Sequence, residues 1–244
     1  ASRGLGDVYK RQQLHIMQQK IKDIKLKFRQ AMNGIVSQNM RNLGANYKIN
    51  FGLTLPLLKK IAEEIPADAQ LANALWNDTA VRESMMLAPM LYPADEFNED
   101  EAEKWVTNMP NIEIADICCK SLFRRLRFAP RKALSWSLSD KMIRQYTGLQ
   151  LATAWLIDHH EINDISIFEQ IADIALKKVA DPNVNLAFPA VNYLKQAVHH
   201  DKLSVYILSN SKNSFENNEL YRNLFDELNQ EKELFKEFSR YDSN

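Results

Sequence analysis

Tryptophans recur along this chain at nearly constant spacing, each within an amphipathic segment. Trp76, Trp105 and Trp136 are 29 and 31 residues apart, and each follows an alanine by three or four residues. A second, more apolar segment with helical periodicity follows each tryptophan segment. This repeat constrains the fold most, because a helix pair cannot bury its own apolar face and needs a neighbour. The expected second helices span residues 79–91, 111–126 and 140–158.

The repeat predicts an all-α protein, an α-solenoid (superhelix) of HEAT-like helix pairs. A fourth pair is expected at residues 164–179 and 183–199, with one or two further helices at 201–241. Strands are not expected, since only six Gly and eight Pro occur and no alternating apolar run is bounded by turn signals. The tryptophans are most simply packing anchors between units, and the second helices would line a concave face.

Residues 1–12 are expected to lie outside the native fold. Asp7 to Gln12 resemble the translation of a DNA adapter used in sequencing libraries, so we assign residues 1–12 to an adapter-derived segment. Residues 13–244 are predicted to form a single HEAT-like-repeat domain. Because no apolar run reaches the length of a membrane span and no signal-peptide pattern occurs, we expect a soluble, cytoplasmic monomer without a membrane partner.

No cofactor and no metal are expected. Cys118 and Cys119 are adjacent, and neighbouring side chains diverge by about 100° on a helix, so two reduced thiols in packed surroundings are predicted. The adjacent histidines at 159–160 and 199–200 also diverge and lack the spacing of metal ligands. No glycine loop of the phosphate-binding kind is present.

Charge is segregated along the chain although its sum is zero. Residues 1–60 hold 12 basic and 2 acidic groups, residues 61–115 hold 2 and 12, and residues 116–144 hold 8 and 2. Two basic zones of this kind can follow a phosphate backbone, and arginines in the second can bind phosphates bidentately. For the first zone an ordinary solvated helix face is an equal alternative. The first zone contains Lys20, Lys22, Lys25, Lys27, Arg29, Arg41 and Lys48, and the second Lys120, Arg124, Arg125, Arg127, Arg131, Lys132, Lys141 and Arg144.

The segment 51–56 has the pattern of a turn that leads into a helix. Gly52 permits a bend, Thr54 can cap the helix, and Pro56 fits its first turn. Three motifs in order, Phe51-Gly52-Leu53-x-x-Pro56, Leu71-Ala72 with Leu75-Trp76, and Arg82-Glu83, resemble the DNA alkylation repair family of HEAT-like-repeat proteins. That family includes DNA glycosylases acting on alkylated purines. The resemblance runs from about Lys20 to His200.

The resemblance implies a curved solenoid that holds duplex DNA against a basic concave face. In the family's glycosylases a carboxylate near the glycosidic bond stabilises the cationic sugar as an N3- or N7-alkylated purine departs. That carboxylate falls on Asp116, the implied catalytic residue. An ion pair of Asp116 with Arg82, Arg144 or Lys120, tying units together, is the alternative for a charge among apolar neighbours.

Other positions depart from the family pattern. Ile112 stands where the glycosylases have a tryptophan, Thr147 where they have an arginine, and Asn192 near a further tryptophan. Arg144 lies one turn before Thr147 and is the expected substitute. The aromatic residues that could replace the two missing tryptophans are Tyr146 and Tyr193. The residues expected to contact DNA are Arg82, Lys120, Arg124, Arg125, Arg127, Arg131, Lys132, Arg144, Thr147, Asn192 and Lys195.

Three functions follow from these observations. The first is a DNA alkylation repair protein with possible glycosylase activity on N3- or N7-alkylated purines, in which Asp116 stabilises charge. The second is a noncatalytic solenoid that binds damaged DNA or DNA of unusual shape through its basic groove. The third is a protein-interaction scaffold, with the acidic stretches 61–115 and 201–244 as partner surfaces.

Overall fold

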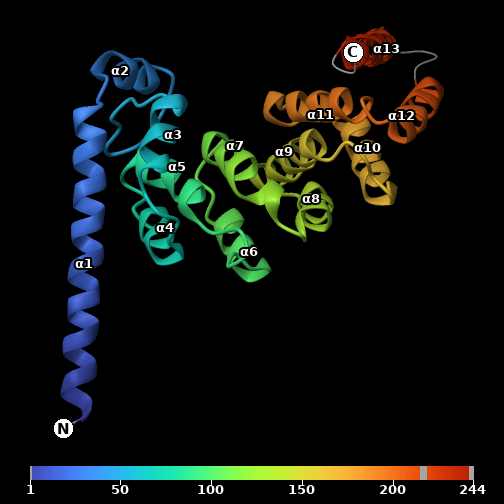
Figure 1. Ribbon diagram of the computed structural model, residues 1–244. Helices are drawn as coiled ribbons and strands as arrows, with labels where there is room; N and C mark the ends of the chain where they lie inside the picture. The colour runs from blue at the N-terminus through green and yellow to red at the C-terminus, as the bar shows by residue number, and fades with distance from the viewer. Residues whose placement is uncertain (1, 215–218, 242–244) are drawn as a thin grey trace. The chain divides into compact units, whose positions relative to one another are not determined.

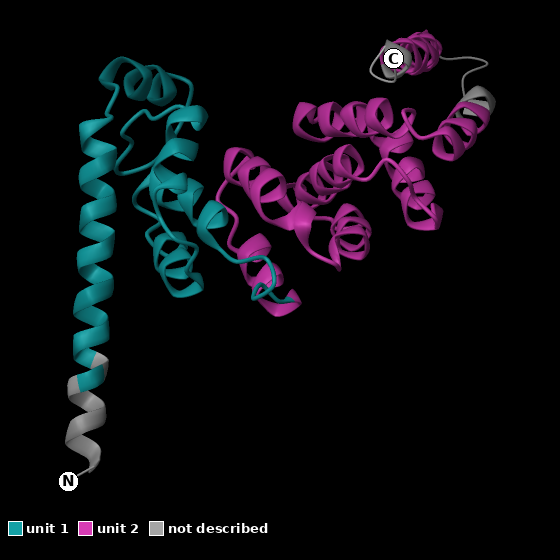
Figure 2. Cartoon of the chain, viewed as in Figure 1, with its two compact units in different colours: residues 1–98 teal, residues 99–244 magenta. Residues whose placement is uncertain are grey.

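The computed structural model describes residues 2–214 and 219–241, and the chain divides into two compact units, residues 1–98 and 99–244 (Figures 1 and 2). The predicted all-α class is confirmed, because the described residues form helices and no strand. An isolated parallel bridge joins Ile49 to Val81. No described helix combines the length and apolar character needed to cross a membrane. The assignment of residues 13–244 to one domain stays a prediction.

The first unit starts with a long helix that packs against the helices following it. Ile24 and Phe28 on this helix are buried, and Lys20 and Lys25 form ion pairs of 2.8 Å with Asp68 and Asp78. The helix also passes through residues 2–12, and their adapter origin stays a prediction. The helices of this unit are α1 (Ser2–Gln30), α2 (Gly34–Asn42), α3 (Leu55–Glu63), α4 (Ala69–Trp76) and α5 (Arg82–Leu91).

The loop before α3 adopts the predicted turn. Gly52 has a φ of 72°, and a Cβ at this position would lie 2.3 Å from the carbonyl oxygen of Asn33, so no other residue fits without strain. Pro56 lies in the first turn of α3 as expected. Thr54 occupies the N-cap position, but its side chain makes no capping hydrogen bond. The role of Thr54 as a cap was therefore wrong.

The loop is held instead by Glu83 at the start of α5. Glu83 is fully buried, and its carboxylate accepts hydrogen bonds from the backbone N–H groups of Phe51 at 3.1 Å, Gly52 at 3.1 Å and Leu53 at 3.3 Å. Arg82 Nη1 pairs with the same carboxylate at 3.0 Å and donates to the Leu53 carbonyl. Two of the family-like motifs, 51–56 and 82–83, are thus the two halves of one buried contact.

The second unit contains the remaining helix pairs. Asn111 caps α7 by accepting from the Ile114 N–H at 3.1 Å. The helix expected over 111–126 is interrupted, because α7 ends at Ser121 and a short 3₁₀ turn follows. The helices are α6 (Glu99–Thr107), α7 (Ile112–Ser121), η1 (Phe123–Arg125), α8 (Ala129–Ser137), α9 (Met142–Asp158), α10 (Ser166–Lys178), α11 (Val184–Ala197), α12 (Asp201–Ser214) and α13 (Glu219–Tyr241).

The repeated tryptophans are buried packing residues, as predicted. Trp76, Trp105 and Trp136 are at most 5% exposed. The indole N–H of Trp136 donates to Glu103 at 2.9 Å and so ties α8 to α6. Cys118 and Cys119 are buried and form no disulfide, and burial raises the pKa of both thiols, so they stay protonated and inert.

Candidate nucleic-acid interface

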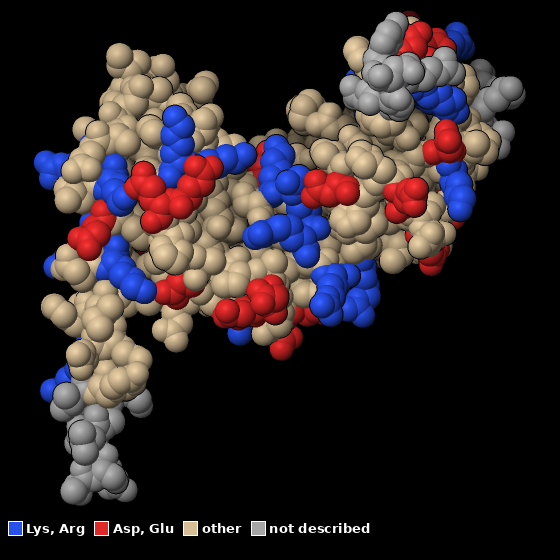
Figure 3. All heavy atoms as spheres, viewed as in Figure 1, with Lys and Arg blue, Asp and Glu red and all other residues tan. Residues whose placement is uncertain are grey.

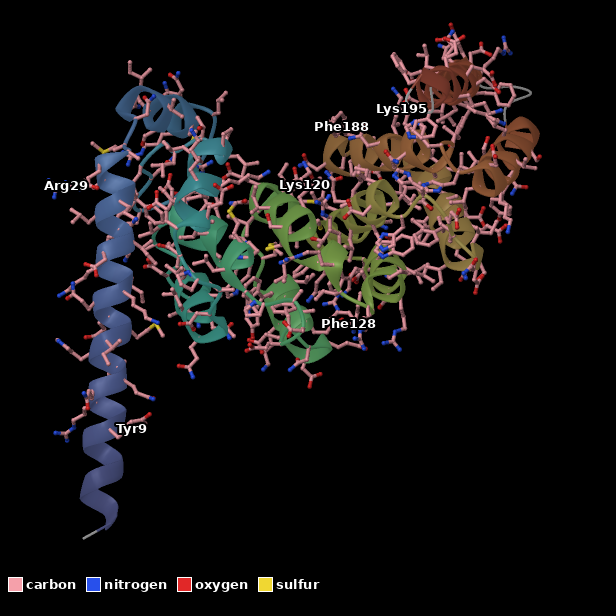
Figure 4. All side chains as sticks on the ribbon, in the orientation of Figure 1. Tyr9, Arg29, Lys120, Phe128, Phe188 and Lys195 are labelled. Carbon is pink, nitrogen blue, oxygen red and sulfur yellow. The ribbon has the colours of Figure 1, made fainter. Side chains whose placement is uncertain are left out.

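A groove of about 360 Å³ opens in the second unit, lined by α7, α9 and α11 with one residue of α13. These are second helices of the pairs, as expected for a concave face. Four predicted site residues line the groove: Asp116 and Lys120 from α7, and Asn192 and Lys195 from α11. Figure 4 shows Lys120, Phe188 and Lys195 along the same edge of this unit. The fold therefore brings these four residues together, although the two on α7 and the two on α11 are far apart in the sequence.

The carboxylate of Asp116 is held by two neutral donors rather than by a cation. Its Oδ1 accepts a hydrogen bond from the Tyr146 hydroxyl at 2.8 Å and another from Gln150 Nε2 at 2.9 Å, and Gln150 also bonds the Tyr146 oxygen at 3.0 Å. Among the described residues, Oδ2 accepts no hydrogen bond. Within the described part of the second unit, Asp116 forms no ion pair with Arg144 or Lys120, two of the partners expected from the sequence.

Tyr146 is suited to this role because it remains a hydrogen-bond donor at neutral pH. Its side chain is only 4% exposed, and burial, assisted by the negative charge of Asp116, raises its pKa well above the usual value. Asp116 therefore presents one oxygen fixed by α9 and one oxygen that a bound molecule can reach.

The predicted arginines of the second basic zone lie outside this groove, and most of them pair with acids. Arg131 and Arg144 form ion pairs with Glu99 and Glu103, respectively, and Lys132 contacts both acids, at 3.3 and 2.9 Å. Arg124 pairs with Asp158 at 3.1 Å. Arg125 and Arg127 are exposed, whereas Arg82 is only 3% exposed in the first unit.

The carboxylate of Glu103 is the centre of this network. Burial raises its pKa, but hydrogen bonds from Lys132, Trp136 and Arg144 outweigh that effect and hold the pKa of Glu103 below its usual value. Lysines of the first basic zone pair with the acidic block in the same way, as in Lys27 with Glu64. Figure 3 accordingly shows blue and red side chains interspersed on the visible face of each unit. The segregated charge of the sequence becomes paired charge in the fold.

Two of the family-aligned positions differ in their environment. Thr147 is fully buried, and its hydroxyl donates to the Ile143 carbonyl at 2.7 Å, so it cannot replace an arginine in the groove. Asn192 is half-buried and lines the groove. Tyr193 is fully buried with its hydroxyl on the Phe168 carbonyl at 2.6 Å, which removes it as a replacement aromatic.

Phe188 is the groove residue that sequence reasoning missed. Its side chain is 61% exposed and lies one turn before Asn192 on α11, so both face the same groove. That spacing was the signal that could have identified it. Gln150 was missed likewise, although it lies one turn after Tyr146 on α9.

Comparisons with known proteins agree with this architecture. A family model described as DNA alkylation repair enzyme matches residues 24–207. A comparison with curated proteins gives no significant match. One similar solved structure is described as a new family of proteins related to the HEAT-like repeat DNA glycosylases with affinity for branched DNA structures. It is 14% identical with a TM-score of 0.72, covering 86% of this chain and 94% of that chain, and this confirms the HEAT-like fold.

Proposed function

We propose that this chain, which belongs to the DNA alkylation repair enzyme family, binds DNA in the groove between α7, α9 and α11. The observation that carries the proposal is the convergence of Lys120, Lys195 and Asn192 around Asp116. Lysine ammonium groups neutralise phosphates and release counterions, and side-chain amides hydrogen-bond to sugars and base edges. Lys120 has no ion-pair partner among the described residues, so its charge is available to a phosphate.

The preferred DNA in this proposal is branched or distorted rather than regular duplex. The similar solved structure is described as having affinity for branched DNA, and we extend that preference to this chain. Two features of the groove support it. Its cations are few, so little affinity comes from a long phosphate track, and Phe188 offers an exposed ring on which an unstacked base can lie.

Binding is tested by fluorescence anisotropy with a labelled four-way junction and a duplex of matched sequence. Replacing both groove lysines, in Lys120→Gln/Lys195→Gln, should weaken binding and flatten the slope of log affinity against log salt by up to about 2. The matched control is Lys177→Gln/Lys202→Gln, which removes two exposed lysines of α10 and α12 outside the groove. Equal losses in both variants would reject the groove as the binding site.

Cleavage of the N-glycosidic bond is the second candidate, favoured by the open Oδ2 of Asp116. A carboxylate there can stabilise an oxocarbenium-like sugar as an alkylated purine leaves. Release of N7-methylguanine or N3-methyladenine from methylated duplex DNA should then be lost in Asp116→Asn. The absence of release above the spontaneous rate, from folded protein, would reject catalysis and leave DNA binding intact.

The scaffold alternative makes the opposite prediction. A protein whose acidic surfaces serve protein partners has no reason to bind DNA. Failure of the wild-type protein to bind either DNA at low salt, with Glu227→Gln/Glu231→Gln equally inactive, would favour this alternative.

A further inference from the structure

Helix α13 contacts residues at the end of the groove through side chains spaced four residues apart. Lys195 Nζ donates to Glu227 at 2.9 Å, and His199 Nε2 lies 2.9 Å from a carboxylate oxygen of Glu231. The ring of Phe235 stacks on His199, with centroids 4.0 Å apart and planes 6° from parallel. Three side chains of α13 thus meet Lys195 on α11 and His199 in the turn after it.

The contacting residues of α13 share one helix face. Glu227, Glu231 and Phe235 follow one another at intervals of four residues on α13. Their partners are Lys195 on α11 and His199 in the turn that follows the end of α11 at Ala197. Glu231 is also part of the groove wall. Glu227 and Glu231 therefore lie where the proposed function requires phosphate contacts.

We propose that α13 is an autoinhibitory element that competes with DNA for Lys195 and His199. The inference rests on the proposed DNA binding by the groove. A carboxylate and a phosphate use the same lysine donors, so Lys195 cannot serve both fully at once. The Lys195–Glu227 ion pair is partly exposed, with side-chain exposures of 32% for Lys195 and 54% for Glu227, and such a pair is weak enough for DNA to displace.

The test compares two pairs of acids on the same helix. Glu227→Gln/Glu231→Gln removes two charges that face Lys195 and His199. Glu233→Gln/Glu237→Gln removes two exposed charges of the same helix that form no hydrogen bond or ion pair with the described residues of α11. Affinity for a four-way junction is measured by anisotropy, with circular dichroism as the folding check. We expect the first variant to bind about 1.4- to 5-fold more tightly, the span of one exposed ion pair, and the second to bind like wild type.

A third variant tests the competition itself. Adding Lys195→Gln to Glu227→Gln/Glu231→Gln should abolish much of the gain, because the gain comes from freeing that lysine. An equal gain in junction affinity from both pairs of substitutions would overturn the inference, because the gain would then come from the lower net negative charge of the protein. No gain from Glu227→Gln/Glu231→Gln would also overturn it, while the proposed function stands if Lys120→Gln still weakens binding. If no variant binds DNA, the proposed function fails first and the inference with it.

Discussion

Glu83 in the first unit and Asp116 in the second are two carboxylates that differ in their burial and in their hydrogen-bond donors. Glu83 in the first unit is fully buried, with three backbone N–H groups and Arg82 as donors. Asp116 in the second unit is half-buried in a groove, with two neutral donors on one oxygen. A carboxylate satisfied on all sides stabilises a fold, whereas one with an open oxygen can act on a ligand.

This difference explains why the family-like motifs say little about activity. Phe51-Gly52-Leu53 and Arg82-Glu83 form one contact, in which each segment satisfies buried polar groups of the other. Residues that would decide the chemistry, such as Asp116 and Asn192, lie in the other unit.

Glu83→Ala should cost about 3–5 kcal/mol of unfolding free energy, because it removes the acceptor of three buried N–H groups and the partner of a buried guanidinium. Urea unfolding followed by circular dichroism measures the loss. A cost below about 1 kcal/mol would contradict the structural role of Glu83.

Gly52→Ala should cost about 2–4 kcal/mol, since the new Cβ would meet the Asn33 carbonyl and an L-residue resists the positive φ. Gly34→Ala is the control, because nothing lies within 4 Å of a Cβ there. The same urea titration compares them, and similar effects in both would contradict the close approach and the positive φ as the reason for Gly52.

Phe188→Ala should weaken junction binding by about 1–3 kcal/mol, the range of one base stacked on an aromatic ring, with stability unchanged. Val184→Ala, on the same helix and 72% exposed, is the control. Anisotropy titrations give the affinities. Unchanged junction binding in Phe188→Ala would remove stacking from the proposed function.

Asp116→Asn should change the unfolding free energy by less than about 1 kcal/mol, because an amide oxygen can still accept from Tyr146 and Gln150. Thermal unfolding monitored by circular dichroism checks this. A loss of unfolding free energy as large as that of Glu83→Ala would show that Asp116 stabilises the fold as Glu83 does.

Glu103→Gln should have the smallest effect, at most about 1 kcal/mol near neutral pH. The depressed pKa of Glu103 means that its stabilisation is present above the unfolded value of about 4.3 and is lost as pH falls through the folded value. Urea midpoints between pH 3 and 7 should therefore differ between wild type and variant at neutral pH and converge in acid. A constant difference across this range would contradict the ion-pair account.

Local patterns could be predicted from the sequence, and distant pairings could not. The tryptophan repeat predicted the helix pairs because helix periodicity and buried anchors are local properties, and Trp105 and Trp136 are buried as expected. Asp116 was found only through the family resemblance. The pairing of Arg144 with Glu103 spans 41 residues, and nothing in the charge pattern specified it. Phe188 escaped notice because single exposed aromatics are common on protein surfaces, and its position one turn before Asn192 was the one local signal.

Hydrogen exchange with and without a four-way junction tests the central claim most directly, because it locates the bound DNA without any substitution. The account predicts slower exchange on DNA binding in peptides covering α7, α9 and α11, with Lys120 and Lys195 among them, and faster exchange in α13 as its contacts are displaced. Protection confined to residues 20–48 or 124–144, with α11 unchanged, would contradict the account and return the DNA to the paired basic zones.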